Sequence, residues 1–294
     1  VLILGAGTMG MQIGFQCAAS GFEVMIYDAF EAALEGADQR MKKVVAHLVR
    51  HQRVDEGKSG RALARISFSN DPVRAGKDAD LINESVPEDP KLKAKVFAQF
   101  NEICPAHTLF TTNSSTLVPS MIAKFTGRAD RFCALHFHDC AVTNVVDVMP
   151  HPGTSQETVD AVMAFSRDIG QFPIELKKEQ NGYVFNTMIM ELMAAALGLA
   201  SRDVASVQDI DRAWMGIMRT LIGPFGIMDS IGLGTVHKVT DYWAEKTDNP
   251  RGRENAAFLK KYVEDGNLGI KTGRGFYQYP EPEFMKPDFL AGIR

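Results

Sequence analysis

The chain has 294 residues and a mass of 32.4 kDa, about twice the usual length of a single domain, so we expect one large and one smaller domain. Hydrophobic residues make up 45% and charged residues 23% of the chain, a composition typical of folded globular proteins and unlike that of disordered ones. The net charge of -4 excludes the strongly basic composition typical of nucleic-acid-binding proteins. No apolar run approaches the roughly 18 residues of a membrane span. We therefore expect neither nucleic acid nor a membrane as a partner.

The first part of the chain alternates short apolar runs with helical patterns. Runs with few charges, typical of strands buried on both faces, occupy residues 1–4, 24–27, 80–83, 108–111, 132–136 and 145–148. Helical periodicity covers residues 9–20, 29–53, 90–103 and 155–170. This alternation predicts an α/β fold of the Rossmann type, in which helices cover both faces of a doubly wound parallel sheet.

The pattern changes near residues 177–181, where long helical stretches begin. Residues 183–201 and 209–221 are the clearest of these stretches. We therefore predict a dinucleotide-binding domain over residues 1–180 and a smaller all-helical domain over residues 181–294.

Four cysteines lie in apolar segments without Cys-x-x-Cys spacing, at positions Cys17, Cys104, Cys133 and Cys140. This distribution predicts reduced thiols in the core and a cytoplasmic location, and it excludes a disulfide scaffold. The first residue is Val1 rather than methionine, which leaves room for an upstream segment such as a removed targeting peptide.

A glycine loop directly follows the first predicted strand and opens a helix. Its glycines are Gly5, Gly7 and Gly10, with Thr8 and Met9 between the last two. In a dinucleotide site the first glycine permits a tight turn, the second lets a pyrophosphate approach the backbone, and the third lets helix and strand pack closely. The free N–H groups at the start of the helix would then face the phosphates. A turn that merely saves space is the alternative interpretation of such a loop.

An acidic residue stands at the spacing that a dinucleotide site requires. Asp28 closes the second predicted strand, about 20 residues after the glycine loop, where a carboxylate accepts hydrogen bonds from the adenosine ribose. Glu31 follows closely and no arginine does, so a 2'-phosphate would be repelled. The loop and Asp28 together predict NAD, rather than NADP, as the cofactor.

Three potential ligands alternate along the chain at the end of a predicted strand. His136, His138 and Cys140 would point the same way if the strand continued. A zinc site is one hypothesis, but its ligands usually come from two separated segments and the sequence offers no second cluster, so we assign no metal. The favoured hypothesis makes His136 a catalytic base, because ligands of open α/β sheets bind beyond the carboxyl ends of the strands. A hydrogen-bonded core histidine is the alternative.

An acid within an apolar run supports the catalytic hypothesis. Asp147 lies inside the predicted strand 145–148, where a carboxylate would be costly without a partner. We expect it to orient His136, and a purely structural acid is the alternative. The polar turn at residues 112–116 also follows a strand, so its hydroxyl and amide groups are placed to bind a substrate oxygen.

Taken together, these motifs resemble the L-3-hydroxyacyl-CoA dehydrogenase family over nearly the whole chain. The segments that carry the resemblance are residues 5–10, 113–117, 135–137, 181–186, 223–226 and 271–277. The resemblance implies an NAD-dependent oxidoreductase of fatty acid metabolism that interconverts 3-hydroxyacyl-CoA and 3-oxoacyl-CoA and forms a homodimer through its helical domain. It implies that His136 is the base, that Ser115 and Asn186 hold the reacting oxygen, and that an acid orients the base. It also places a set of residues on the nicotinamide side of the cofactor: Glu88, Lys93 and Lys271.

The segment after His136 departs from the family pattern. The family usually continues Phe-Phe-Asn-Pro, whereas this chain has Phe137, His138, Asp139 and Cys140. The family's orienting glutamate corresponds to Asp147, and Asp139 is a second candidate for that role. These differences bear on the substrate more than on the reaction.

Two further functions remain as alternatives. Residues 148–152 resemble the gulonate dehydrogenase and lambda-crystallin branch, whose members oxidise free 3-hydroxy acids such as gulonate or carnitine. A protein that binds NAD without catalysis is the third possibility, although the joint presence of Ser115, His136 and Asn186 argues against it. A stripe formed by Lys43, His47 and Arg50 suits the phosphates of coenzyme A, or is simply a solvated helix face.

Overall fold

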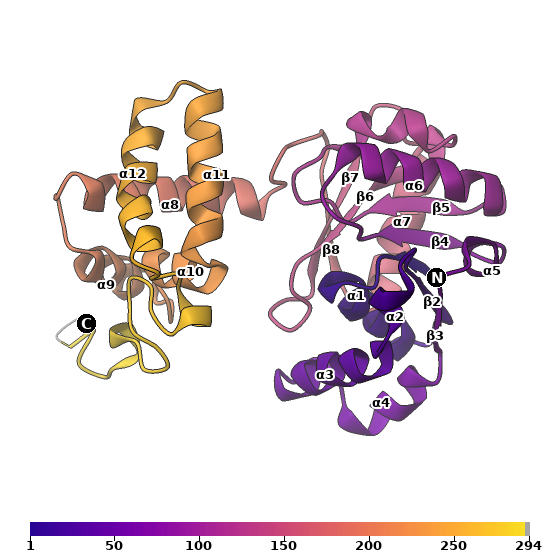
Figure 1. The fold of residues 1–294 in the computed structure, drawn as a ribbon, viewed down its shortest axis with the longest axis horizontal. Coiled ribbons are helices and arrows are strands. Elements are labelled where there is room, and N and C mark those ends of the chain that lie inside the picture. The colour runs from indigo at the N-terminus through magenta and orange to yellow at the C-terminus, as the bar shows by residue number, and fades with distance from the viewer. Residues whose placement is uncertain (292–294) are drawn as a thin grey trace. The chain divides into compact units, whose positions relative to one another are not determined.

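The computed structural model describes residues 1–291 and divides into two compact units (Figure 1). The first unit covers Val1–Val184, and the second begins at Phe185. Among the described residues, no helix combines the length and the apolar character that crossing a membrane requires.

The first unit is built on one sheet of eight strands. In chain order these are β1 (Leu2–Leu4), β2 (Val24–Tyr27), β3 (Ile66–Ser69), β4 (Leu81–Glu84), β5 (Leu109–Thr112), β6 (Phe132–Phe137), β7 (Val145–Pro150) and β8 (Phe172–Glu175). Their order across the sheet is β3-β2-β1-β4-β5-β6-β7-β8, and all neighbours are parallel except β6 and β7. The predicted Rossmann-type fold is confirmed. β6 and β7 are antiparallel because only seven residues link them, too few for the crossover that parallel strands need.

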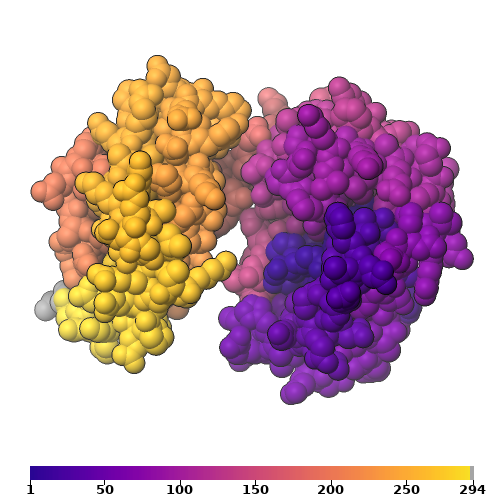
Figure 2. All heavy atoms as spheres, in the orientation of Figure 1, coloured from indigo at the N-terminus to yellow at the C-terminus, as the bar shows by residue number. Residues whose placement is uncertain are grey.

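Helices lie on both faces of this sheet. They are α1 (Thr8–Ala19), α2 (Glu31–Leu34), α3 (Ala37–Arg50), α4 (Glu56–Leu63), α5 (Pro72–Gly76), α6 (Pro90–Ile103) and α7 (Gln156–Asp168), with three 3₁₀ turns at Pro119–Met121, Ala123–Phe125 and Ala129–Arg131. The single helix predicted over residues 29–53 is wrong, because Gly36 adopts a φ of 64° that an α-helix does not allow. The chain therefore forms α2 and α3 separately. In the space-filling view the N-terminal segments, in indigo, lie among later segments of the same unit (Figure 2).

The side chains of β1 alternate between two cores. Ile3 packs in the core that contains α1 and α3 residues such as Phe15 and Leu48. Leu2 and Leu4 face the opposite core, which contains Phe97 and other residues of α6. Burial on both faces is the reason that this strand reads as an uninterrupted apolar run.

The second unit is all-helical in the part that the structure describes, as predicted. Its helices are α8 (Phe185–Ser201), α9 (Val207–Met218), α10 (Pro224–Ile231), α11 (Leu233–Lys246) and α12 (Pro250–Glu264), followed by 3₁₀ turns at Ile270–Thr272 and Glu283–Met285 (Figure 1). The helix predicted over residues 209–221 ends earlier, because Arg219 adopts a left-handed φ of 58°. Leu197, Phe225 and Leu259 are fully or almost fully buried in the shared core.

Two buried aspartates hold the C-terminal segment against these helices. Asp229 of α10 accepts hydrogen bonds from the backbone N–H groups of Phe276 (2.9 Å) and Tyr277 (3.0 Å). Asp211 of α9 accepts one from the Tyr277 hydroxyl at 2.9 Å and one from the N–H of Phe225 at 2.9 Å. Burial raises the pKa of both carboxyls. These contacts give the motifs at residues 223–226 and 271–277 a structural role.

All four cysteines are free and buried, which confirms the predicted reduced core thiols. Burial raises the pKa of Cys17, Cys133 and Cys140 to about 12, so these sulfurs stay as thiols at neutral pH.

Candidate active site

The glycine loop leaves space for a ligand at one glycine and none at the other two. A Cβ on Gly5, whose φ is 111°, would stand 2.7 Å from the Ser85 carbonyl oxygen. A Cβ on Gly10 would stand 2.0 Å from the carbonyl oxygen of Gly5. A Cβ on Gly7 would meet nothing within 4 Å. Gly5 and Gly10 therefore shape the turn, and Gly7 leaves the backbone open to an approaching group.

The start of α1 and the end of β2 complete a dinucleotide cradle. Gly7 caps α1 without any side-chain hydrogen bond, so no side chain competes for the first N–H groups of the helix, which includes Thr8 and Met9. Asp28 Oδ2 accepts a hydrogen bond from Ala6 N at 3.0 Å, which ties the carboxylate to the glycine loop. The residues present therefore fit NAD: N–H groups for the pyrophosphate and a carboxylate for the ribose.

His136 and Asp147 are direct neighbours across the antiparallel strands β6 and β7. The two residues pair in the register, and His136 Nδ1 lies 3.2 Å from Asp147 Oδ2. Both side chains are almost fully buried, with 6% and 2% of their surfaces exposed. Burial alone would raise the pKa of Asp147, but the hydrogen bonds and charges of His136 and His138 outweigh it and hold that pKa below its usual value. The carboxylate therefore stays ionised beside His136, with Nε2 of the ring remaining for a reactant.

A second histidine shares the same carboxylate. His138 Nε2 lies 3.3 Å from Asp147 Oδ2, and the His136 and His138 rings meet edge to face with centroids 4.7 Å apart. Cys140 does not join them: β6 ends at Phe137, so the alternation of faces stops there and the thiol packs in the core. The expectation that His136, His138 and Cys140 share a face is thus wrong for the cysteine.

Stacking on the ring, and a hydrogen bond to the backbone of the next residue, fix the position of His136. The Tyr183 ring stacks on the imidazole with centroids 4.4 Å apart and planes 10° apart, and its hydroxyl donates to the Ser114 carbonyl oxygen at 2.5 Å. Asn113 Oδ1 accepts a hydrogen bond from the backbone N–H of Phe137 at 2.7 Å.

Asp139, the other candidate for orienting the histidine, instead accepts a hydrogen bond from the N–H of Ala141. Asp147 is thus the carboxylate that the fold places beside His136.

A buried ion network lies under the turn that follows β5. Lys93 Nζ contacts Glu84 Oε1 at 2.7 Å and Glu88 Oε2 at 3.2 Å, and its side chain is 1% exposed. Burial raises the pKa of Glu84. Glu88 accepts hydrogen bonds from Ser114 Oγ and Thr116 Oγ1, and these bonds hold its pKa low against the effect of burial. The network therefore fixes both sides of the turn that presents Ser115.

The sequence-derived site residues fall into two groups. Ser115 is exposed in the turn after β5, the strand that pairs with β6, so it stands at the same sheet edge as His136 and Glu88. Asn186 in the first turn of α8 and Lys271 in a 3₁₀ turn belong to the second unit. Sequence reasoning gave no role to Glu84 or to Tyr183, although an acid at the end of an apolar strand and an aromatic residue inside a quoted motif were available signals.

Sequence comparison covers both units. The model of the family described as "3-hydroxyacyl-CoA dehydrogenase, NAD binding domain" matches residues 1–180, and that of the corresponding C-terminal domain matches residues 182–279. A probable 3-hydroxyacyl-CoA dehydrogenase of Caenorhabditis elegans is 34% identical over 284 residues, which cover 95% of each chain.

Structural comparison finds similar chains over nearly the whole length. A solved diketoreductase, described by the words "Substrate-directed dual catalysis of dicarbonyl compounds by diketoreductase", superposes with a TM-score of 0.87 and 40% identity, covering 95% of this chain and 98% of that one. The (S)-3-hydroxybutyryl-CoA dehydrogenase PaaH1 from Ralstonia eutropha gives a TM-score of 0.83 and 31% identity, with the same coverage.

Proposed function

This chain belongs to the 3-hydroxyacyl-CoA dehydrogenase family, and we propose that His136 exchanges the proton in its reaction. The family is that of NAD-dependent oxidoreductases, which interconvert a 3-hydroxyacyl-CoA and a 3-oxoacyl-CoA. The observation that supports the role of His136 most strongly is its pairing with Asp147 at the carboxyl end of β6, because dinucleotide enzymes of this fold bind reactants beyond that edge.

The proton step follows from the orientation of the ring. With Nδ1 directed at Asp147, Nε2 of His136 accepts the proton of the C3 hydroxyl in oxidation and returns it in reduction. NAD, when bound, supplies the acceptor for the hydride that leaves C3. Asp147 stabilises the imidazolium that oxidation produces, since the two groups are close and shielded from water. Ser115 and Asn186 hold the reacting oxygen in this proposal.

The buried ion network refines the proposed roles of two cofactor residues. Glu88 is partly exposed at the sheet edge, which supports its proposed contact with the nicotinamide side of NAD. Lys93 is almost completely covered, so it acts by holding Glu88 and neutralising Glu84. Lys271 completes the set on the nicotinamide side.

A free dicarbonyl or 3-hydroxy acid is the second candidate substrate. The identity with the diketoreductase, 40%, exceeds the 31% with PaaH1, and the diketoreductase catalyses reactions of dicarbonyl compounds. The substitutions at His138 and Asp139 lie next to the proposed base, where they would affect substrate choice.

The substrate class is tested by NADH absorbance. The chain is assayed with NADH and acetoacetyl-CoA, with NADH and a free diketone, and with NAD and L-gulonate or carnitine. We expect a higher kcat/KM for the thioester than for any free compound. A higher kcat/KM for a free compound would overturn the CoA assignment, and NADH binding without any turnover would favour the non-catalytic alternative.

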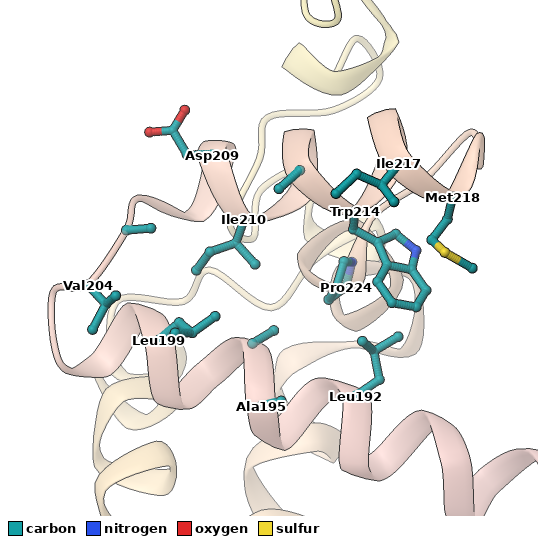
Figure 3. Close-up of a pocket in the computed structure, with 13 residues that line it drawn as sticks. Leu192, Ala195, Leu199, Val204, Asp209, Ile210, Trp214, Ile217, Met218 and Pro224 are labelled. Carbon is teal, nitrogen blue, oxygen red and sulfur yellow. The ribbon is translucent and has the colours of Figure 1, made fainter. Parts of the chain in front are cut away.

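We also propose that the second unit pairs two copies of the chain. An apolar groove of about 490 Å³ runs between α8 and α9, and Leu192, Leu199 and Trp214 line it (Figure 3). Ile217 at this groove is 79% exposed, and Leu221, shortly after it in the chain, is 90% exposed. Exposed apolar patches of this kind are typical of interaction surfaces. The same helices of a second copy are the occupant that this proposal names, since the family resemblance implies a homodimer through this domain.

Light scattering during gel filtration tests the dimer. We expect a dimer for the wild-type chain and a monomer for Ile217→Lys, because a charge in an apolar interface loses its water without gaining a partner. Glu245→Lys, which places a lysine at an exposed position of another helix, α11, is the control and should leave the dimer intact. A wild-type monomer at all concentrations would overturn the proposal.

For the location, we propose the cytoplasm. The four free, buried cysteines support a reducing compartment.

A further inference from the structure

The cluster of His136, His138 and Asp147 has a geometry that the proton step does not require. One carboxylate oxygen, Asp147 Oδ2, lies 3.2 Å from His136 Nδ1 and 3.3 Å from His138 Nε2. The donor atoms of the three residues all lie within 4.8 Å of one another. The proposed proton step uses only His136 and Asp147. It does not account for the contact of His138 with the same carboxylate oxygen.

We propose that these three side chains form a binding site for a divalent transition-metal ion such as Zn²⁺, and that occupancy of this site stops the reaction. In a tetrahedral zinc site with ligands at about 2.0–2.1 Å, neighbouring donor atoms stand about 3.3–3.4 Å apart. Two of the three separations in the cluster already match that value. The third, between the two nitrogens, has to shorten by at most about 1.4 Å.

The donor set selects the class of metal. Two imidazole nitrogens and one carboxylate suit Zn²⁺, Co²⁺ or Cu²⁺, whereas Mg²⁺ and Ca²⁺ prefer oxygen ligands alone. His138 is the most exposed of the three, with 18% of its side-chain surface accessible, so an ion would enter along this ring. Tyr183 holds the His136 ring in place by stacking on it.

Metal binding would block catalysis through the tautomer of His136. A neutral imidazole carries one N–H, so an ion on Nδ1 places the proton on Nε2. Nε2 then has no lone pair to accept the proton of the substrate hydroxyl, and Asp147 no longer faces an imidazolium. Inhibition therefore rests on the proposed role of His136, whereas the binding of the ion does not.

Two measurements test the proposal separately. Co²⁺ is titrated into the metal-free chain while its visible d–d absorption is followed, and turnover of NADH is measured at buffered concentrations of Zn²⁺. We expect a bound-Co²⁺ spectrum that Zn²⁺ displaces, and inhibition that a chelator reverses and Mg²⁺ does not reproduce. His138→Phe, which places the family's usual residue there, should weaken Co²⁺ binding and Zn²⁺ inhibition by more than about tenfold.

The control disrupts a second close pair of histidine rings, His47 in the last turn of α3 and His51 at its C-cap, whose centroids are 4.6 Å apart. His51→Ala should leave Zn²⁺ inhibition unchanged, and His138→Gln should repeat the effect of His138→Phe if the latter folds poorly. Equal metal sensitivity in the wild-type chain and both His138 variants would overturn the proposal, as would the absence of a bound-Co²⁺ spectrum. A normal Co²⁺ spectrum in a chain without turnover would support the metal site and overturn the proposed function instead.

Discussion

Asp147 contacts two histidines through a single oxygen atom, so its replacement is the sharpest test at the scale of a residue. In Asp147→Asn the amide N–H₂ can face His136 Nδ1, which would move the ring proton to Nε2, the nitrogen that accepts a proton in the proposed reaction. We expect kcat to fall by about 10²–10⁴-fold, as when a general base is disabled. Asp139→Asn should cost less, because Asp139 bonds the backbone of Ala141. A larger loss in Asp139→Asn would reassign the orienting role.

Replacing the buried Lys93 should lower the free energy of unfolding by an amount that depends on pH. Lys93→Met leaves the buried carboxylate of Glu84 without its cation, which should lower the free energy of unfolding by about 3–5 kcal/mol near neutral pH. A carboxyl group whose pKa is raised by folding, like that of Glu84, stabilises the fold at low pH and loses this contribution as the pH rises through its folded pKa. The deficit of Lys93→Met should therefore shrink as the pH falls from about 7 to about 5.

Urea unfolding at both pH values measures this effect. The double variant Glu84→Gln/Lys93→Met is the control: it retains Glu88 but has no buried carboxylate at position 84, so its deficit should depend less on pH. An equal change with pH in the single and double variants would show that Glu84 is not the group responsible.

At the scale of an element, two glycines of the turn between β1 and α1 have different roles: Gly10 is required for folding and Gly7 for the proposed binding of NAD. Gly10→Ala should destabilise the fold by about 1–3 kcal/mol or more, because its Cβ would overlap the Gly5 carbonyl oxygen. The added Cβ of Gly7→Ala would meet no atom within 4 Å. This substitution should therefore lower the free energy of unfolding by less than about 1 kcal/mol, as a change of helix cap does. It should nevertheless weaken NADH binding by at least about tenfold, equivalent to 1.4 kcal/mol. Thermal unfolding and NADH fluorescence measure the two effects, and an unchanged NADH affinity in Gly7→Ala would refute this placement of the pyrophosphate.

The strands that sequence patterns revealed lie inside the sheet, with a neighbouring strand on each side. β1, β4 and β6 read as continuous apolar runs because they lie inside the sheet. The strands that were missed, β3 and β8, are its two edges: Ser67 is exposed within β3, and β8 contains Pro173 with Phe172 61% exposed. An edge strand has one unpaired side and a partly wet surface, so it carries no comparable signal.

At the scale of the whole molecule, short motifs predicted the positions of the candidate site residues better than the contacts that support those residues. The glycine loop, Asp28 and the His136–Asp147 pair followed from spacing and strand position, since each depends on neighbours along one element or across one pair of strands. The Glu84–Lys93 pair joins the end of β4 to α6, and Tyr183 stacks on His136 of β6, so both contacts depend on how separate elements pack rather than on strand position alone. The roles of Asn186 and Lys271, in the second unit, remain predictions.

The measurement that tests the central claim most directly is NADH oxidation by acetoacetyl-CoA in the wild-type chain and in His136→Ala, with NADH binding followed by fluorescence in both. If His136 exchanges the proton, kcat should fall by about 10²–10⁴-fold in the variant. NADH affinity should remain within about threefold, because the cofactor cradle is built by the glycine loop and Asp28. A variant that binds NADH and turns over acetoacetyl-CoA at the wild-type rate would contradict the account.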